Sequence, residues 1–150
     1  MNNSPRETLI DSCGQMLARI KRADGFLTDA GLQFTAEPAP VVGDEASEFI
    51  TVVWDKQERA ADPALLRTHR LTTVRVIAKV KASLTNAQER LDALVTDIEA
   101  AFEKQQFRFP VGYQFPQYQS AEPLAASITA GWVGAAVTYT SHIPIRRPAA

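Results

Sequence analysis

Residues 70–82, RLTTVRVIAKVKA, constrain the fold more than any other stretch, because apolar and polar side chains alternate along them. Side chains of a β-strand point alternately to the two faces of a sheet, so a period of two predicts a strand. One face is apolar and is formed by Val74, Val76, Ala78 and Val80. The other face is mostly basic and is formed by Arg75, Ile77, Lys79 and Lys81. We therefore predict a sheet that buries one face and leaves the other for solvent or a partner.

Two segments show the three- and four-residue spacing of apolar side chains that is typical of amphipathic helices. The first helix is predicted over residues 5–23, where Ser4 and Glu7 form a capping box and Pro5 suits the first helical position. The second helix is predicted to begin at a capping box formed by Thr85 with Gln88 or by Asn86 with Glu89, and to end near Lys104. Its polar side carries Asp92, Asp97, Glu99 and Glu103. Both helices have one apolar face, so both are expected to pack on the sheet.

Further strands are predicted at residues 49–55 and 132–143, which are rich in β-branched and aromatic side chains. Residues 56–68 are predicted to be a polar connection, and residues 107–123 a Pro-interrupted arm or irregular edge strand. The order helix, strands, helix, strands predicts an α+β fold, in which an antiparallel or mixed β-sheet packs against two main helices. A chain of 150 residues fits a single domain, with a flexible C-terminal end at about 144–150.

The charge and cysteine content argue against several classes of protein. The formal net charge is −1, whereas a dedicated nucleic-acid binder usually carries a strong basic excess. A single-strand binder also interleaves basic and aromatic residues, but the aromatic segment 107–118 lies outside the basic strand. The single cysteine excludes an intrachain disulfide and favours a reducing compartment. No apolar run reaches the ~20 residues of a membrane helix and no secretory signal is visible, so we expect a soluble, cytosolic protein without membrane contact.

Candidate nucleophiles, bases and metal ligands are few. Cys13 lies on the apolar side of the first predicted helix, where a free cysteine behaves as a small hydrophobic residue. His69 and His142 each lie at a strand end, without a second histidine or cysteine at ligand spacing. The acidic run GDEASE at 43–48 lacks the spacing of a calcium loop, and no glycine-rich nucleotide motif occurs. We therefore predict no catalytic residues, no metal site and no cofactor.

Five segments, taken in order, carry a resemblance to a known family. They are EPAPVVGDEASEFITVVWD, HRLTTVRVIAKVKA, NAQERLDALVTDIEAAF, GYQFPQYQS and GWVGAAVTYTSHI. With the amphipathic helix that precedes them, they cover nearly the whole chain. In this order the sequence resembles the phage tail terminator family, the lambda-type minor tail protein U group.

The resemblance implies a structural protein of the virion tail that is assembled in the host cytoplasm and has no enzymatic activity. Members of the family form a six-membered ring on the head-proximal end of the tail tube. The ring stops further addition of the major tail tube protein and presents its other face to a head-completion or connector protein. DNA contacts such a ring only by passing through its central opening.

The two-faced strand indicates where such a ring would make contacts. In a closed ring, each subunit offers one patch to one neighbour and a different patch to the other. The basic residues Arg75, Lys79 and Lys81 are expected to contact acidic residues of the adjacent copy or to face the lumen, and a solvated outer sheet face is the alternative. The acidic candidates are Asp44, Glu45 and Glu48.

Two further segments are expected to dock on other subunits. The polar connection contains Arg59, Asp62 and Arg67, which are candidates for contact with the tail tube, because long loops in compact domains are usually functional. The aromatic arm contributes Tyr113, Phe115 and Tyr118. These rings can wrap a neighbour, since exposed aromatic residues often anchor interfaces, or they can cover the open end of the domain's own core.

Two other functions stay open at the level of the sequence. One is a different neck component of the same particle, a head-completion or connector protein with a related fold, which would bind capsid portals in place of tail tubes. The other is a small α+β domain that binds a ligand or nucleotide. A large pocket with convergent polar groups would favour the second alternative, and a shallow surface would not.

Overall fold

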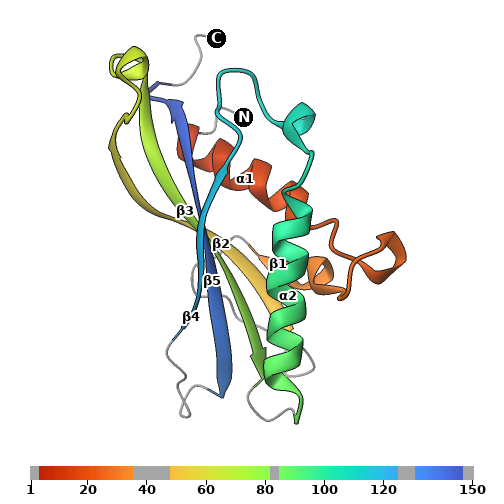
Figure 1. Ribbon diagram of the computed structural model, residues 1–150. Helices are drawn as coiled ribbons and strands as arrows, with labels where there is room; N and C mark the ends of the chain where they lie inside the picture. Colours follow the sequence, from red (N-terminus) through yellow and green to blue (C-terminus); the bar gives the residue numbers. More distant parts are fainter. Residues whose placement is uncertain (1–3, 36–47, 82–84, 125–130, 147–150) are drawn as a thin grey trace.

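A computed structural model describes residues 4–35, 48–81, 85–124 and 131–146 of the chain. Two helices pack on one face of a five-stranded sheet whose strand order is β1-β2-β3-β5-β4 (Figure 1). The helices are α1 (Pro5–Leu17) and α2 (Ala87–Ala101). The strands are β1 (Phe34–Thr35), β2 (Glu48–Arg59), β3 (His69–Lys81), β4 (Gln117–Pro123) and β5 (Trp132–Pro144). The predicted α+β class, with a mixed sheet against two main helices, is confirmed.

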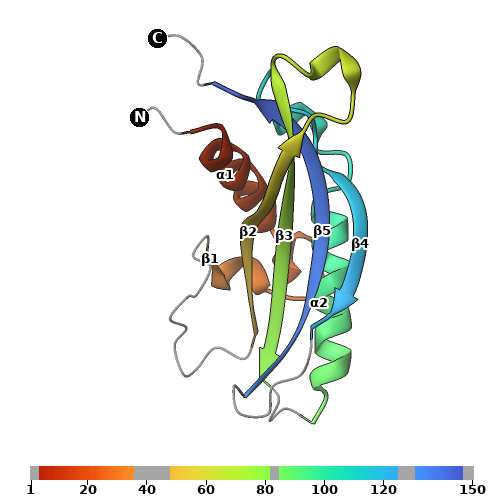
Figure 2. The same cartoon turned by 90° about the vertical axis from the view of Figure 1, so that its left-hand side faces the viewer.

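β3 is the central strand of the sheet and lies antiparallel to both β2 and β5. The four apolar side chains of its predicted inner face are fully buried, and the residues between them are partly exposed. Figure 2 looks onto the outer face of the sheet, which we call the open face because neither helix covers it. The alternation in the sequence therefore predicted the orientation of this strand correctly.

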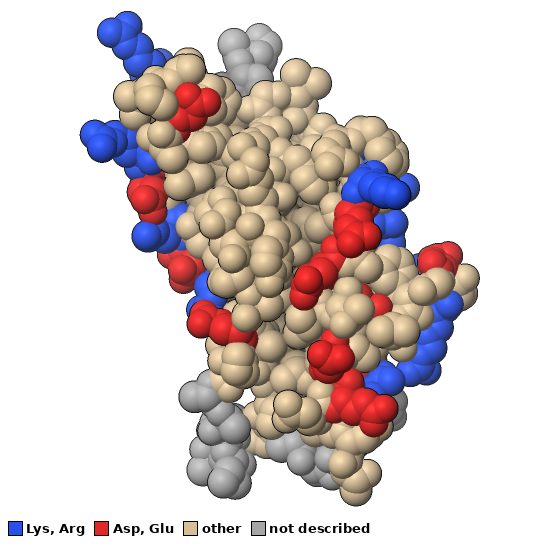
Figure 3. Space-filling view, viewed as in Figure 1, with Lys and Arg blue, Asp and Glu red and all other residues tan. Residues whose placement is uncertain are grey.

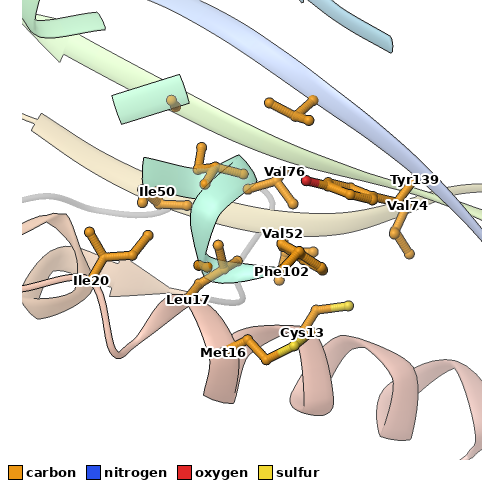
Figure 4. Packing of buried hydrophobic residues seen from close by; sticks show 14 of the residues in the cluster. Cys13, Met16, Leu17, Ile20, Ile50, Val52, Val74, Val76, Phe102 and Tyr139 are labelled. Atoms are coloured by element: carbon orange, nitrogen blue, oxygen red, sulfur yellow. The ribbon is translucent and has the colours of Figure 1, made fainter. Parts of the chain in front are cut away.

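The core forms where the inner face of the sheet meets the apolar sides of both helices (Figure 4). α1 contributes Leu9, Cys13, Met16 and Leu17, and α2 contributes Leu94, Ile98 and Ala101. Burial of one large aliphatic side chain stabilises a fold by about 1.5–3 kcal/mol. Each helix is thus held by its apolar face, as expected from the spacing of its residues.

α1 begins at the predicted capping box but ends earlier than predicted. The Glu7 amide donates to Ser4 Oγ, and the Ser4 amide donates to Glu7 Oε2, both at 3.2 Å. The helix ends at Leu17 because the chain then turns so that Gly31 N–H can donate to Ile20 O at 2.9 Å. A Cβ atom on Gly31 would lie 2.6 Å from Ala18 O, so this close approach requires glycine.

Asp97 does not lie on the exposed side of α2, where its helical position had placed it. The residue is only 2% exposed. Its carboxylate accepts hydrogen bonds from Leu27 N at 2.9 Å, from Thr28 N at 2.8 Å and from Thr28 Oγ1 at 2.7 Å. Asp97 therefore ties the segment after α1 to α2.

Three boundaries differ from the sequence predictions. β2 continues to Arg59, so the polar connection is reduced to residues 60–68, which include a single 3₁₀ turn at Pro63–Leu65. In the segment 107–123, only the last seven residues form the edge strand β4, and all seven are exposed. β5 includes Pro144, and Ile145 N–H donates to Thr68 O at 3.0 Å. The first two residues of the tail that was predicted to be flexible are therefore held by the sheet and the β2–β3 connection.

Candidate assembly surfaces

The first candidate surface is the open face of the sheet. Arg75, Ile77, Lys79 and Lys81 all lie on it, and each side chain is partly exposed. Arg75 pairs in register with Val53 of β2, which adds a second partly exposed apolar side chain to the same face. The open face therefore combines cationic groups with apolar ones, as the sequence predicted.

The open face is not purely basic. The Arg75 guanidinium lies 3.9 Å from the Glu122 carboxylate of β4, on the far side of β5. Near the C-terminal end of β2, Lys56 Nζ lies 2.8 Å from Glu58 Oε2. Ion pairs between exposed side chains contribute little to stability, because water and salt screen them. Both pairs are therefore weak enough to be exchanged for contacts with another molecule.

Glu48, one of the three acidic residues expected to contact the basic row of a neighbour, is engaged inside the domain. Its register partner is Val80, so its side chain lies on the inner face of the sheet. The carboxylate receives hydrogen bonds of 2.6, 2.8 and 3.1 Å from the Arg90 guanidinium of α2. The prediction for Glu48 is therefore wrong, and Asp44 and Glu45 lie outside the described residues.

The connection between β2 and β3 forms the second candidate surface. Asp62 is exposed, and its carboxylate accepts a hydrogen bond from Ala64 N at 3.0 Å and caps the 3₁₀ turn. Arg59 and Arg67 are exposed, and Arg70 stands opposite Arg59 in the register. Figure 3 shows basic side chains projecting from this end of the molecule, so the tip of the β2–β3 hairpin keeps its positive charge.

The three aromatic candidates divide into two groups. Tyr113 and Phe115 are partly buried and pack against the core, and Phe115 makes edge-to-face contacts with Phe109 at 5.3 Å and Phe102 at 6.4 Å. This supports the alternative in which these two rings cover the domain's own core. Tyr118 keeps 51% of its surface exposed and remains a candidate contact.

Two shallow hollows lie between α2 and β4. One has a volume of about 240 Å³ and is lined by Glu99, Phe102, Glu103, Phe115, Pro116, Tyr118 and Tyr139. The other has a volume of about 250 Å³ and is lined by Gln88, Leu91, Asp92, Val95, Ala121, Glu122, Pro123 and Ala135. In Figure 3 an uncharged surface runs beside a row of acidic side chains on α2. The sequence indicated the acidic side of α2 but not the hollows, because the sequence pattern of the helix does not show that β4 lies beside it.

The thiol of Cys13 is placed where it cannot act as a nucleophile. Cys13 is completely buried among apolar side chains of α1 and the sheet. Burial raises the pKa of this thiol to about 12, because the interior disfavours the charged thiolate. The thiolate is the reactive form, so the side chain acts as a core residue at neutral pH.

Both histidine rings are engaged in structural hydrogen bonds. His142 Nε2 accepts from Ala61 N at 3.1 Å, so Nδ1 carries the proton and donates to Gln114 Oε1 at 2.9 Å. His69 Nε2 lies 2.9 Å from Gly112 O and must donate to it, which leaves Nδ1 to accept from the Thr68 hydroxyl at 2.7 Å. These rings fix the β2–β3 connection and the segment before β4 at one end of the sheet.

The described part of the chain holds no group of three or more His, Cys, Asp and Glu side chains that could bind a metal ion. None of its helices is long and apolar enough to cross a membrane. Comparison with known proteins found no family model and no curated protein that matches this chain. The surfaces described above therefore carry the functional argument.

Proposed function

We propose that this protein is a structural tail terminator, which forms a ring at the head-proximal end of a phage tail tube. The observation that carries the proposal is the open face of the sheet. Along β3 it presents Arg75, Ile77 and Lys79, and both helices lie on the opposite face. A surface of mixed apolar and cationic side chains is suited to a protein partner.

The shape of the domain agrees with membership of a ring. A closed ring is built from heterologous contacts, so a subunit needs two different patches that point in different directions. The open face supplies one such patch, and the surface of α2 and β4 supplies the other. Figure 1 shows α2 on one side of the sheet, and the open face lies on the other side.

The ring stops tube growth by covering the end of the tube without reproducing the surface to which the next tube subunit binds. Its other side then serves as the site for a head-completion or connector protein. The hairpin tip with Arg59 and Arg67 is the candidate contact with one of these partners. Cationic side chains that line the opening would attract the DNA backbone without reading its bases.

The proposal is tested by mixing the purified protein with growing tail tubes and measuring tube lengths by negative-stain electron microscopy. The unaltered chain is expected to cap the tubes and to stop their elongation. The double variant Arg75→Glu with Lys79→Glu is expected to reduce capping, whereas Arg108→Glu, which changes an exposed charge in the 3₁₀ turn after α2, should behave like the unaltered chain. Tubes that elongate equally with and without the unaltered protein would refute the proposal. Binding to capsid portals in place of tubes would identify a connector instead.

A further inference from the structure

The outer side of α2 carries an acidic row that forms no ion pair with another described residue. Glu89, Asp92, Glu99 and Glu103 are all exposed, and none forms an ion pair with another described residue. Arg90 is the one basic residue of the helix, and it is occupied by Glu48. Like charges one helical turn apart destabilise a helix by about 0.2–0.5 kcal/mol per pair. The row therefore costs stability within the isolated domain.

The basic row on the open face has a matching length. The four residue steps from Arg75 to Lys79 span about 13 Å at the rise of a β-strand. The seven residue steps from Asp92 to Glu99 span about 11 Å at the rise of an α-helix. Two cations on one copy can thus stand opposite two carboxylates on another copy at nearly the same spacing.

The apolar parts of the two surfaces also correspond. On the open face, the partly exposed Ile77 lies between Arg75 and Lys79, and its register partners Thr51 of β2 and Ala136 of β5 are buried. Next to the acidic row, the hollow lined by Leu91 and Val95 provides an apolar recess. Apolar contact at the centre with charges around it is the usual arrangement of a protein interface.

Strand addition at β4 is a poor alternative for the contact between subunits. The pairing of β4 with β5 is interrupted by a bulge between Tyr118 and Ser120. The strand also ends in Glu122 and Pro123. Bulges, charges and prolines on an edge strand are the features that prevent edge-to-edge pairing. The neighbour is therefore expected to meet side chains on a face of the domain.

We propose that the open face of one copy docks on the α2 surface of the next copy, with Arg75 and Lys79 opposite Asp92 and Glu99. This inference rests on the proposed ring and names its subunit interface. Each copy uses its open face toward one neighbour and its α2 surface toward the other, so the contact is heterologous and can close a ring. Charge pairs at such an interface speed and orient association and are weakened by salt.

Two charge-reversed variants test this pairing. The first, Asp92→Lys with Glu99→Lys, makes both surfaces basic, and the second, Arg75→Glu with Lys79→Glu, makes both surfaces acidic. Each variant alone is expected to assemble at a concentration at least about tenfold higher than the unaltered chain. An equimolar mixture should regain assembly, because the two variants can alternate around a ring with opposite charges at every contact. Sedimentation velocity at low salt, with and without tail tubes, measures the assembly.

The control mixture combines the first variant with Arg59→Glu and Arg67→Glu, which reverses charges only at the hairpin tip. This mixture leaves every second contact basic against basic, so it should not form rings. Circular dichroism of each variant checks that it folds. If a reversed variant does not fold, the neutral pair Asp92→Asn with Glu99→Gln is used, and its assembly should lose the salt dependence shown by the unaltered chain.

The outcomes separate this inference from the proposed function. If the unaltered chain forms rings or caps tubes but the mixture assembles no better than either variant alone, the pairing is wrong and the ring proposal stands. If the unaltered chain neither forms rings nor caps tubes, both are overturned. Recovery of assembly in the reversed mixture, and not in the control mixture, supports both.

Discussion

Replacement of Asp97 by alanine should be among the most damaging single changes in this protein. The substitution removes the acceptor of three hydrogen bonds, two of which come from Thr28, whose side chain and backbone are completely buried. A buried donor left without a partner costs about 1–3 kcal/mol, and hydrogen bonds to a charged group are the stronger kind. The two Thr28 donors and the more accessible Leu27 amide together give an expected loss of about 3–5 kcal/mol. For a chain of this length, that loss lowers the melting temperature by about 10 °C.

The measurement is urea unfolding followed by circular dichroism, with Asp92→Ala as the matched control. Asp92 lies on the same helix, is exposed, and its side chain makes no hydrogen bond with another described residue, so its replacement should change the free energy of unfolding by less than about 0.5 kcal/mol. Thr28→Val tests the pairing directly, because its effect should largely disappear in the Asp97→Ala background. Equal effects of Asp97→Ala and Asp92→Ala would refute the argument that Asp97 acts as a buried clamp.

Gly31, Ser4 and Cys13 provide further tests of the fold. Gly31→Ala should lower the free energy of unfolding by about 1–3 kcal/mol, measured by urea unfolding, because the new Cβ atom would lie 2.6 Å from Ala18 O. A loss no larger than that caused by Ala→Gly elsewhere on the surface would show that the backbone shifts to accommodate the Cβ atom. Ser4→Ala should lower the free energy of unfolding by about 1 kcal/mol through loss of the capping box, and Ser4→Asp should restore most of it. Cys13 should resist thiol reagents at pH 8 until urea unfolds the chain, and rapid labelling of the native protein would contradict its burial. Since burial raises the pKa of this thiol to about 12, its contribution to the free energy of unfolding should be complete below about pH 9 and should be lost as the pH rises toward 12.

The sequence predicted those features of the fold that depend on local periodicity. The alternation from Val74 to Val80 placed β3 in the sheet and distinguished its two faces correctly. The capping box at Ser4 and Glu7 fixed the start of α1. Both signals are local, because strand alternation and helix capping involve residues close together in the chain.

The predictions that failed required knowledge of distant contacts. Asp97 occupies a polar position on α2, and only the return of Leu27 and Thr28 to that helix buries it. Glu48 lies just before the predicted strand 49–55, whereas β2 begins at Glu48. Glu48 and Ile50 are two residues apart on β2, so their side chains point to the same, inner face, where the Arg90 guanidinium of α2 binds the Glu48 carboxylate.

The candidate surfaces also differ in whether the sequence could predict them. The open face could be predicted because one strand contains its whole basic row, from Arg75 to Lys81. The hollows beside α2 could not, because they depend on how α2 and β4 pack side by side, and the local sequence of neither element sets that contact. Residues 106–116, which precede β4, carry aromatic rings that complete the core from outside the sheet.

The charged side chains include some that stabilise the fold and others that stay exposed on its surface. The carboxylates that the domain uses for its own stability, Asp97 and Glu48, are nearly buried and are fully engaged with donors. A helix selected only for stability would place lysine or arginine one turn from Asp92 or Glu99, since such pairs stabilise a helix, yet Thr96 stands between them. Lys79 on β3 likewise has no ion pair with another described residue. The acidic row of α2 and the cations Arg75 and Lys79 of β3 lie on different faces of one domain, and a second copy carries the complement of both.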